Sequence, residues 1–268
     1  MTEPTTKAYR NEGFLNSRDG RALRILAEYL EPKSRFDREN VDDTIVFMGS
    51  ARTLSREQAE ANLAKIQSEG GDLAAAQMAL KMSAYYEAAR SLAYRLTLWS
   101  KTLDSIEKRF VVCTGGGPGI MEAANRGASE AQGVNVGLTI SLPNEQFDNA
   151  YITRGLSVHF HYFFMRKFWF YYLAKAVIVC PGGFGTLDEL FELLTLVQTR
   201  KMTKPMPIVL FGNEYWREVV NFDALVKHGM INAADLSLVH RTDSVDDAYD
   251  FIVKHLTRDS LGQPGAVM

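Results

Sequence analysis

The sequence has few cysteines, little net charge and no long apolar run. Its two cysteines, Cys113 and Cys180, are too few for a disulfide framework, and their spacing fits no zinc motif. Lysine and arginine total 30 against 32 acidic residues, and this net charge of -2 gives no electrostatic reason to expect a nucleic-acid polymer as partner. The longest apolar stretch, residues 168–180, contains Lys175 and is too short to cross a bilayer. Since the N-terminus also lacks the basic flank and apolar run of a signal peptide, we expect a cytoplasmic protein without membrane contact.

Two named phosphate-binding motifs are missing as well. No Gly-Lys dipeptide occurs in the chain, which excludes a Walker-type P-loop. The glycine-rich run 115–119 is followed by Ile120, where the dinucleotide fingerprint requires its third glycine. Binding of a nicotinamide dinucleotide is therefore disfavoured, and a mononucleotide or another small phosphate ester remains as the candidate ligand.

Short runs rich in valine, isoleucine and phenylalanine indicate strands that are buried on both faces. The four clearest lie at residues 44–48, 110–113, 176–180 and 207–211. Weaker strand candidates lie at residues 134–142, 156–163 and 236–240. Helical patterns separate them at residues 120–132, 187–200, 215–228 and 245–256. This alternation predicts an α/β fold with a Rossmann-like, doubly wound and mainly parallel sheet flanked by helices.

Helical segments also precede and interrupt the predicted sheet. An apolar stripe that stops at Pro32 predicts a helix packed on the core, within an N-terminal helical extension of residues 1–41. Residues 55–83 are polar and alanine-rich, and we interpret them as a helical insertion in a single nucleotide-binding domain of residues 42–258. Residues 259–268 carry glycine and proline and are expected to form a flexible tail.

Small residues follow the clearest strands, at the sheet edge where ligands of doubly wound folds bind. They are Gly49 and Ser50 after the first strand, residues 115–119 after the second and residues 181–186 after the third. Glycine lets a ligand approach the backbone, and a helix N-terminus offers unpaired N–H groups and a partial positive charge. Either glycine loop alone fits a tight turn equally well. Both loops at one edge favour a phosphate site.

Residues 186–189, Thr-Leu-Asp-Glu, fit a capping box in which Glu189 bonds back to the N-cap residue Thr186. The alternative is catalytic, because a carboxylate in this first turn stands beside any phosphate ester bound to the preceding loop. Glu189 could then orient a water or stabilise a cationic sugar transition state. Arg166 precedes an aromatic run and could neutralise a phosphate or hydrogen-bond a leaving base. Glu192, one turn beyond Glu189, either assists it or is solvated.

Metal and thiol chemistry find little support in the sequence. His159 and His161 alternate along a strand candidate, but no carboxylate or cysteine at ligand spacing accompanies them. We therefore interpret both histidines as structural and expect no metal. Cys113 and Cys180 have no adjacent base, and we interpret them as small buried hydrophobes.

Three segments together resemble the LONELY GUY family, whose members are often labelled lysine decarboxylases. The segments are residues 114–123, 165–167 and 181–189. The last of them, Pro-Gly-Gly-x-Gly-Thr-x-x-Glu, is the most specific, and the resemblance covers roughly residues 42–256. Phe184 and Asp188 replace the tyrosine and glutamate usual in plant members, which leaves the preferred base open. The chain has no His-Lys dipeptide of the kind that holds pyridoxal phosphate in decarboxylases.

The resemblance implies hydrolysis of the N-glycosidic bond of a nucleoside 5′-monophosphate, AMP or an N6-modified AMP, to free base and ribose 5-phosphate. Its catalytic pair would be Arg166 and Glu189, and no cofactor would be needed. The residues expected to bind substrate or phosphate are Gly49, Ser50, Gly115, Gly116, Gly117, Glu145, Lys167, Gly182, Gly183, Gly185, Thr186 and Thr195. A homodimer is also implied, with residues 168–172 and 190–199 as the interface unless they are core. The alternative function is a non-catalytic carrier of a nucleotide or of molybdenum cofactor.

Overall fold

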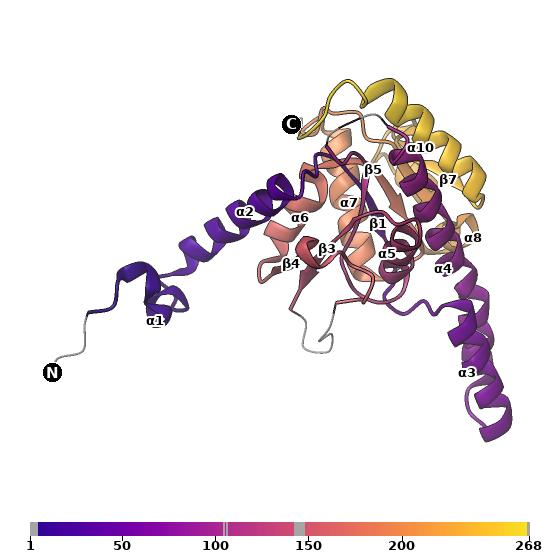
Figure 1. The fold of residues 1–268 in the computed structure, drawn as a ribbon. Coiled ribbons are helices and arrows are strands. Elements are labelled where there is room, and N and C mark those ends of the chain that lie inside the picture. Colours follow the sequence, from indigo (N-terminus) through magenta and orange to yellow (C-terminus); the bar gives the residue numbers. More distant parts are fainter. Residues whose placement is uncertain (1–4, 104, 106, 142–147, 267–268) are drawn as a thin grey trace.

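Seven parallel strands form one sheet in the order β4-β3-β2-β1-β5-β6-β7 (Figure 1). The computed structural model describes residues 5–103, 105, 107–141 and 148–266. The strands are β1 (Thr44–Met48), β2 (Val111–Thr114), β3 (Asn135–Ile140), β4 (Ser157–Phe160), β5 (Ala174–Val179), β6 (Ile208–Phe211) and β7 (His240–Thr242). The strand order reverses between β1 and β5, and ligands of doubly wound sheets bind at such a reversal. The predicted α/β fold is confirmed.

Helices cover both faces of the sheet, which explains why the strands lack polar alternation. Helices α4 (Leu73–Ser100), α5 (Ile120–Glu130) and α10 (Val245–Asp259) cover one face. The other face packs against α2 (Arg21–Arg38), α6 (Phe163–Tyr172), α7 (Phe184–Gln198), α8 (Asn213–Val219) and α9 (Phe222–Lys227). In β1, the neighbours Ile45 and Val46 are both fully buried, one in each of the two cores. Both faces of this central strand are therefore excluded from solvent.

Helix α2 continues through Pro32, so the prediction that it stops there is wrong. A proline within a helix cannot donate a hydrogen bond to the carbonyl four residues earlier, here that of Glu28. This carbonyl instead accepts a hydrogen bond from the indole Nε1 of Trp169, at 2.9 Å. The carboxylate of Glu28 also accepts from the backbone N–H groups of His161 and Tyr162, at 2.8 and 3.2 Å. Tertiary contacts thus replace the bond that the proline removes.

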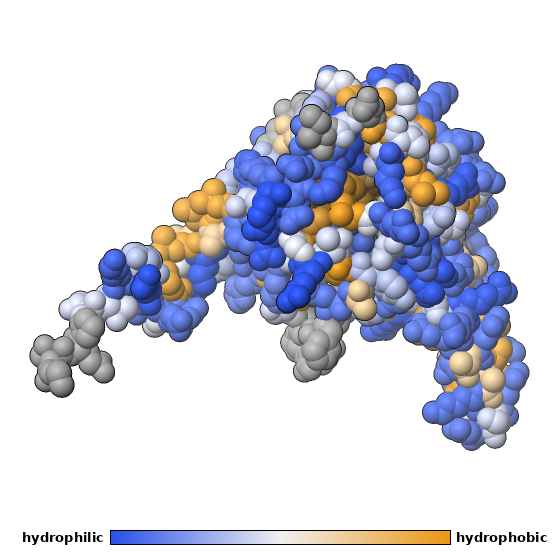
Figure 2. Space-filling view, viewed as in Figure 1, coloured by the Kyte–Doolittle hydropathy of each residue, from blue (hydrophilic) through white to orange (hydrophobic). Residues whose placement is uncertain are grey.

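Two helical segments project from the sheet. Helices α1 (Glu12–Leu15) and α2 extend to one side, and α3 (Arg56–Glu69) with the start of α4 extends to the other (Figure 1). Helix α2 carries the leucines Leu23, Leu26 and Leu30, each about half exposed, in the apolar surface visible in Figure 2. No helix in the described part of the chain is both long and apolar enough to cross a membrane.

Two predicted elements, one helix and one strand, differ from those in the structure. The single helix expected at residues 215–228 is divided into α8 and α9, because Asn221 caps the second of them. Its side-chain oxygen accepts a hydrogen bond from the backbone N–H of Ala224, at 2.8 Å. The weak strand candidate at residues 236–240 is mostly the 3₁₀ turn Ala233–Leu238, which precedes β7.

The C-terminal tail is anchored by a buried ionic cluster. The cluster consists of Asp43, Arg109 and Lys175. It hydrogen-bonds to the backbone of the tail residues Ser260, Gln263 and Gly265. These bonds tie the backbone of the tail to the sheet up to Gly265. The flexible tail predicted for residues 259–268 stays a prediction. Residues 267–268 lie outside the described part of the chain.

Candidate active site

A cavity of about 630 Å³ opens at the carboxyl ends of β1 and β5, where the strand order reverses. This volume lies within the usual range for sites that bind small molecules. Most residues predicted from the sequence as site residues line it: Gly49, Ser50, Gly115, Gly116, Gly117, Arg166, Gly182, Gly183, Gly185, Thr186 and Glu189. The fold thus brings together three loops that are far apart in the sequence.

The loop after β1 lies between the other two loops and is hydrogen-bonded to both. The backbone N–H of Ser50 donates to the carbonyl of Pro181, at 2.9 Å. The carbonyl of Ser50 accepts from the backbone N–H of Ile120, at 3.0 Å. Because these bonds join the loops through their backbones, the three loops form one continuous rim.

The loop after β2 is fixed by buried polar groups. Gly116 has a φ of 73°, and a Cβ on it would lie 2.2 Å from Cγ2 of Thr139, so only glycine fits here. Its N–H donates to the hydroxyl of Thr114, at 2.9 Å. The amide of Asn149 donates to the carbonyls of Gly116 and Gly117, both at 3.1 Å. These contacts hold the loop in its shape before any ligand binds.

Helix α7 begins at Phe184, so the interpretation of residues 186–189 as a capping box is wrong. Gly183 is the N-cap, and Thr186 lies inside the first turn. A Cβ on Gly182 would lie 2.1 Å from the hydroxyl oxygen of Thr186, so that hydroxyl lies directly over the loop. The first turn of this 15-residue helix therefore lines the cavity, and helix N-termini of this kind can bind an anion.

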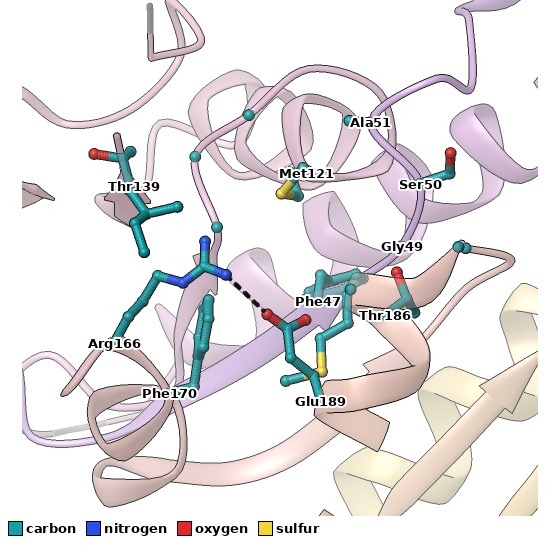
Figure 3. A pocket seen from close by; sticks show the side chains of 18 of the residues that line it. Phe47, Gly49, Ser50, Ala51, Met121, Thr139, Arg166, Phe170, Thr186 and Glu189 are labelled. Carbon is teal, nitrogen blue, oxygen red and sulfur yellow. Dashed lines mark hydrogen bonds and ion pairs between the residues drawn. The ribbon is translucent and has the colours of Figure 1, made fainter. Parts of the chain in front are cut away.

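Arg166 from α6 and Glu189 from α7 meet at the wall of the cavity (Figure 3). The guanidinium Nη2 lies 3.4 Å from Oε1 of Glu189, and the two side chains are only 12% and 13% exposed. The guanidinium also lies over the rings of Phe163 and Phe170, with centroids 5.1 and 5.4 Å away. The capping role would have turned Glu189 back toward its own helix end, whereas its carboxylate points to the cavity.

Burial raises the pKa of Glu189 from its ordinary value of 4.5 to about 7. The positive charge of Arg166 opposes this rise, and the negative charge of Asp188 adds to it. A carboxyl group with a pKa near neutrality can exchange a proton with a reacting group at cellular pH. A shifted carboxyl group in a cleft is typical of functional sites.

The shifted pKa predicts a pH-dependent effect of Glu189→Gln on stability. An acid whose pKa is higher in the folded than in the unfolded state stabilises the fold less as pH rises, because folding then removes an ionised carboxylate from water. The variant should match the wild type near pH 4 and exceed its free energy of unfolding by about 3 kcal/mol above pH 7. Urea unfolding of both proteins across this range measures the difference. A constant difference at every pH would contradict the shift.

Two described residues that were expected to bind the substrate are not part of the cavity wall. The ammonium of Lys167 forms ion pairs with Asp188 and Glu192, at 2.6 and 2.8 Å. The hydroxyl of Thr195 donates to a carbonyl of its own helix, at 2.7 Å. Neither side chain lines the cavity. Glu145 lies outside the described residues.

His159 lines the cavity, although the sequence analysis interpreted it as structural. Its Nε2 lies 2.7 Å from the hydroxyl of Ser141, and its Nδ1 lies 2.9 Å from that of Thr139. The sequence signal for its place in the cavity was its position near the end of a strand, at the sheet edge where the glycine loops lie. Asp148 and Tyr215 also line the cavity and carried no signal in the sequence.

The described residues were also examined for metal-ligand groups and exposed thiols. Among the described residues, no three side chains of histidine, cysteine, aspartate or glutamate are grouped to hold a metal ion. Cys113 and Cys180 are buried, and burial raises the pKa of both thiols, that of Cys180 to about 12. A thiol with so high a pKa is a poor nucleophile near neutral pH.

Comparisons with known sequences find a family match that begins in α5 and ends in α10. Residues 121–252 match the family model described as "Possible lysine decarboxylase". A protein of Oryza sativa subsp. japonica, named "Probable cytokinin riboside 5′-monophosphate phosphoribohydrolase LOG4", is 36% identical over 61 residues. This match covers 23% of the present chain and 26% of the rice protein, so the chain spans about a quarter of this relative.

Solved structures with a similar arrangement are distant in sequence. A molybdenum cofactor carrier protein from Chlamydomonas reinhardtii aligns with a TM-score of 0.47 and 17% identity, over 81% of this chain and 99% of its own. The molybdenum cofactor binding protein from Rippkaea orientalis aligns with a TM-score of 0.45 and 18% identity, over 80% of this chain and 96% of its own.

Proposed function

Residues 121–252 match the lysine decarboxylase-like family that includes the LONELY GUY proteins, and from this premise and the cavity we propose that the protein is a nucleoside 5′-monophosphate phosphoribohydrolase. It hydrolyses the N-glycosidic bond of AMP or an N6-modified AMP. The products are the free base and ribose 5-phosphate. The observation that carries the proposal is Glu189, a largely buried carboxylate with a pKa of about 7 that lines the same cavity as the first turn of α7.

In this proposal the 5′-phosphate binds at the first turn of α7. Backbone N–H groups of Gly183, Gly185 and Thr186, together with the hydroxyl of Thr186, supply donors there. Gly49 and Ser50 form the facing side of the same rim. Binding energy from the remote phosphate holds the ribose against Arg166 and Glu189, where the bond is cleaved.

Cleavage passes through a ribosyl cation with positive charge on C1′ and the ring oxygen. The ionised carboxylate of Glu189 stabilises this charge and orients a water molecule for attack. The water oxygen bonds to C1′ as the bond from C1′ to the base nitrogen breaks, and a water proton is transferred by way of Glu189 to the departing base. Arg166 holds the carboxylate in position through its contact at 3.4 Å.

The proposal predicts how the rate depends on pH. Because the ionised form of Glu189 is needed, kcat/KM for AMP should rise with pH through about 7 and then level off. Asp188→Asn removes a negative charge that contributes to the raised pKa, so the midpoint of this variant should move to lower pH. Initial rates between pH 5 and 9 measure both profiles. A profile that is flat, or unmoved by Asp188→Asn, would argue against Glu189 as the titrating group.

The experiment that tests the function is direct. Purified protein is incubated with AMP, GMP, CMP and isopentenyl-AMP, and the free base is measured by chromatography. We expect base from at least one adenine nucleotide and none from adenosine, which lacks the phosphate. Folded protein that releases base from none of the four would exclude the proposed function and favour the carrier.

The expected homodimer remains a proposal. In the two candidate interface segments, Trp169, Phe170, Leu190 and Leu193 are buried in the core of the single chain. These residues are thus unable to form an exposed interface. The exposed Phe163, Phe164 and Phe191 on the same helices are the better candidates for contact with a second copy.

A further inference from the structure

A second cavity, of about 320 Å³, adjoins the candidate active site. Residues that line both cavities are Ser50, Arg52, Gly182, Gly183 and Tyr215. The shared wall includes the glycines that precede the first turn of α7, where the proposed function places the phosphate. A phosphate bound at these glycines therefore has open space on two sides, toward Glu189 and toward the second cavity.

The shared wall carries a positive charge that the proposed reaction does not use. Arg52 is exposed, lines both cavities and forms no ion pair with any described residue. Its backbone N–H donates to the hydroxyl of Ser50, at 3.0 Å, which fixes the residue next to the anion site. Tyr215, which also lines both cavities, donates its hydroxyl proton to the carbonyl of Gly182, at 2.5 Å. An arginine in this position suits a second phosphate.

Apart from Thr53, the residues that line only the second cavity are apolar. Met78, Ala79 and Met82 come from the insertion, and Leu54 and Pro181 complete the set. Methionine side chains are flexible and polarisable, so they adapt to ligand groups of different shape. Met78 lines this cavity and is still about half exposed. The insertion thus has a face that a ligand can cover.

We infer that the site takes a nucleoside 5′-diphosphate or an ester of one, and that the second cavity binds the part beyond the first phosphate. The inference rests on the proposed function, which orients the nucleoside toward Arg166 and Glu189. The first phosphate then lies at the turn of α7 and the second at Arg52. An esterifying group, where one is present, packs against Met78 and Met82.

The test compares the binding of ADP and AMP by isothermal titration calorimetry. ADP should bind to the wild type about ten times as tightly as AMP, since a hydrogen-bonded charge pair supplies about 1.4 kcal/mol or more. Arg52→Gln should remove this preference and leave AMP binding nearly unchanged. Ala79→Phe should do the same by filling the second cavity. Ala84→Phe is the matched control, because Ala84 is exposed on the same helix and lines neither cavity.

The outcomes separate the two proposals. Equal binding of ADP and AMP, or a preference for ADP that survives both Arg52→Gln and Ala79→Phe, overturns the inference and leaves the monophosphate hydrolase intact. A preference for ADP that both variants abolish, without release of base from any nucleotide, supports the diphosphate site and overturns the proposed reaction. Failure to bind either nucleotide overturns both.

Discussion

Glu189→Gln should lower kcat for base release by about 10³-fold or more, with little change in the affinity for AMP. Glutamine fills the same volume and can still contact Arg166, but it carries no negative charge to stabilise the ribosyl cation. The phosphate contacts lie on a different turn of α7 and stay in place. Single-turnover rates and equilibrium binding, measured on the same preparation, separate the two effects.

Glu192→Gln is the matched control for this prediction. The same substitution is made one turn further along α7, at a residue that pairs with Lys167 and does not line the cavity. Above about pH 8 its kcat should stay within about twofold of the wild type, because Glu189 is then ionised in both proteins and Glu192 does not line the cavity. If Glu189→Gln retained wild-type turnover, the catalytic role of this carboxylate would be excluded. A carrier protein would show no turnover in any variant.

Asp43→Ala should destabilise the fold by about 3–5 kcal/mol, the usual effect of removing one partner from a buried ion pair. Asp43 is fully buried and pairs with Arg109 and with Lys175, whose Nζ lies 3.6 Å from its carboxylate. Both cations are also buried, and burial lowers the pKa of Lys175. Without Asp43 the two positive charges would face each other without a counter-charge, and the tail would lose the bond between Asp43 and Gly265.

Asp42→Ala is the control, because Asp42 is adjacent, partly exposed and without a side-chain ion pair to any described residue. Its free energy of unfolding should change by about 0.5 kcal/mol or less. Chemical denaturation at pH 7 measures both variants. Equal effects of the two substitutions would show that the buried cluster does not stabilise the tail and the sheet.

The fold was predictable because its strands are buried on both faces. Runs such as residues 44–48 are apolar throughout, which indicated a central parallel strand, and β1 has these bounds. The positions of the helices followed from the alternation of strands and helical patterns. Element ends were less predictable, as at Asn221, whose capping side chain divides a helix that the apolar pattern presents as continuous. The predicted domain boundaries remain predictions.

Long-range contacts explain what the sequence analysis missed. Local rules place a helix end at Pro32, because proline cannot donate a hydrogen bond to the carbonyl of Glu28. In the structure Trp169 donates to this carbonyl instead, and the helix continues. The tail is anchored by Asp43, which is more than two hundred residues away from Gly265 in the sequence. No local pattern contains either contact.

The residues of the candidate site were predictable where the site is built from backbone. The prediction was less successful where the site depends on the direction of a side chain. Glycine loops at strand ends must gather at one sheet edge, so their residues line the cavity. Lys167 follows Arg166 directly, yet only Arg166 faces the cavity, because neighbouring residues on a helix point in different directions. His159 was missed because its partners, Thr139 and Ser141, belong to the neighbouring strand and its end.

The most direct measurement is a crystal structure of the Glu189→Gln variant with AMP bound. We expect the phosphate at the first turn of α7, within hydrogen-bond distance of the N–H groups of Gly185 and Thr186. We also expect C1′ of the ribose next to residue 189, with the base toward Thr139 and His159. A phosphate bound elsewhere, or a ribose turned away from residue 189, would contradict it.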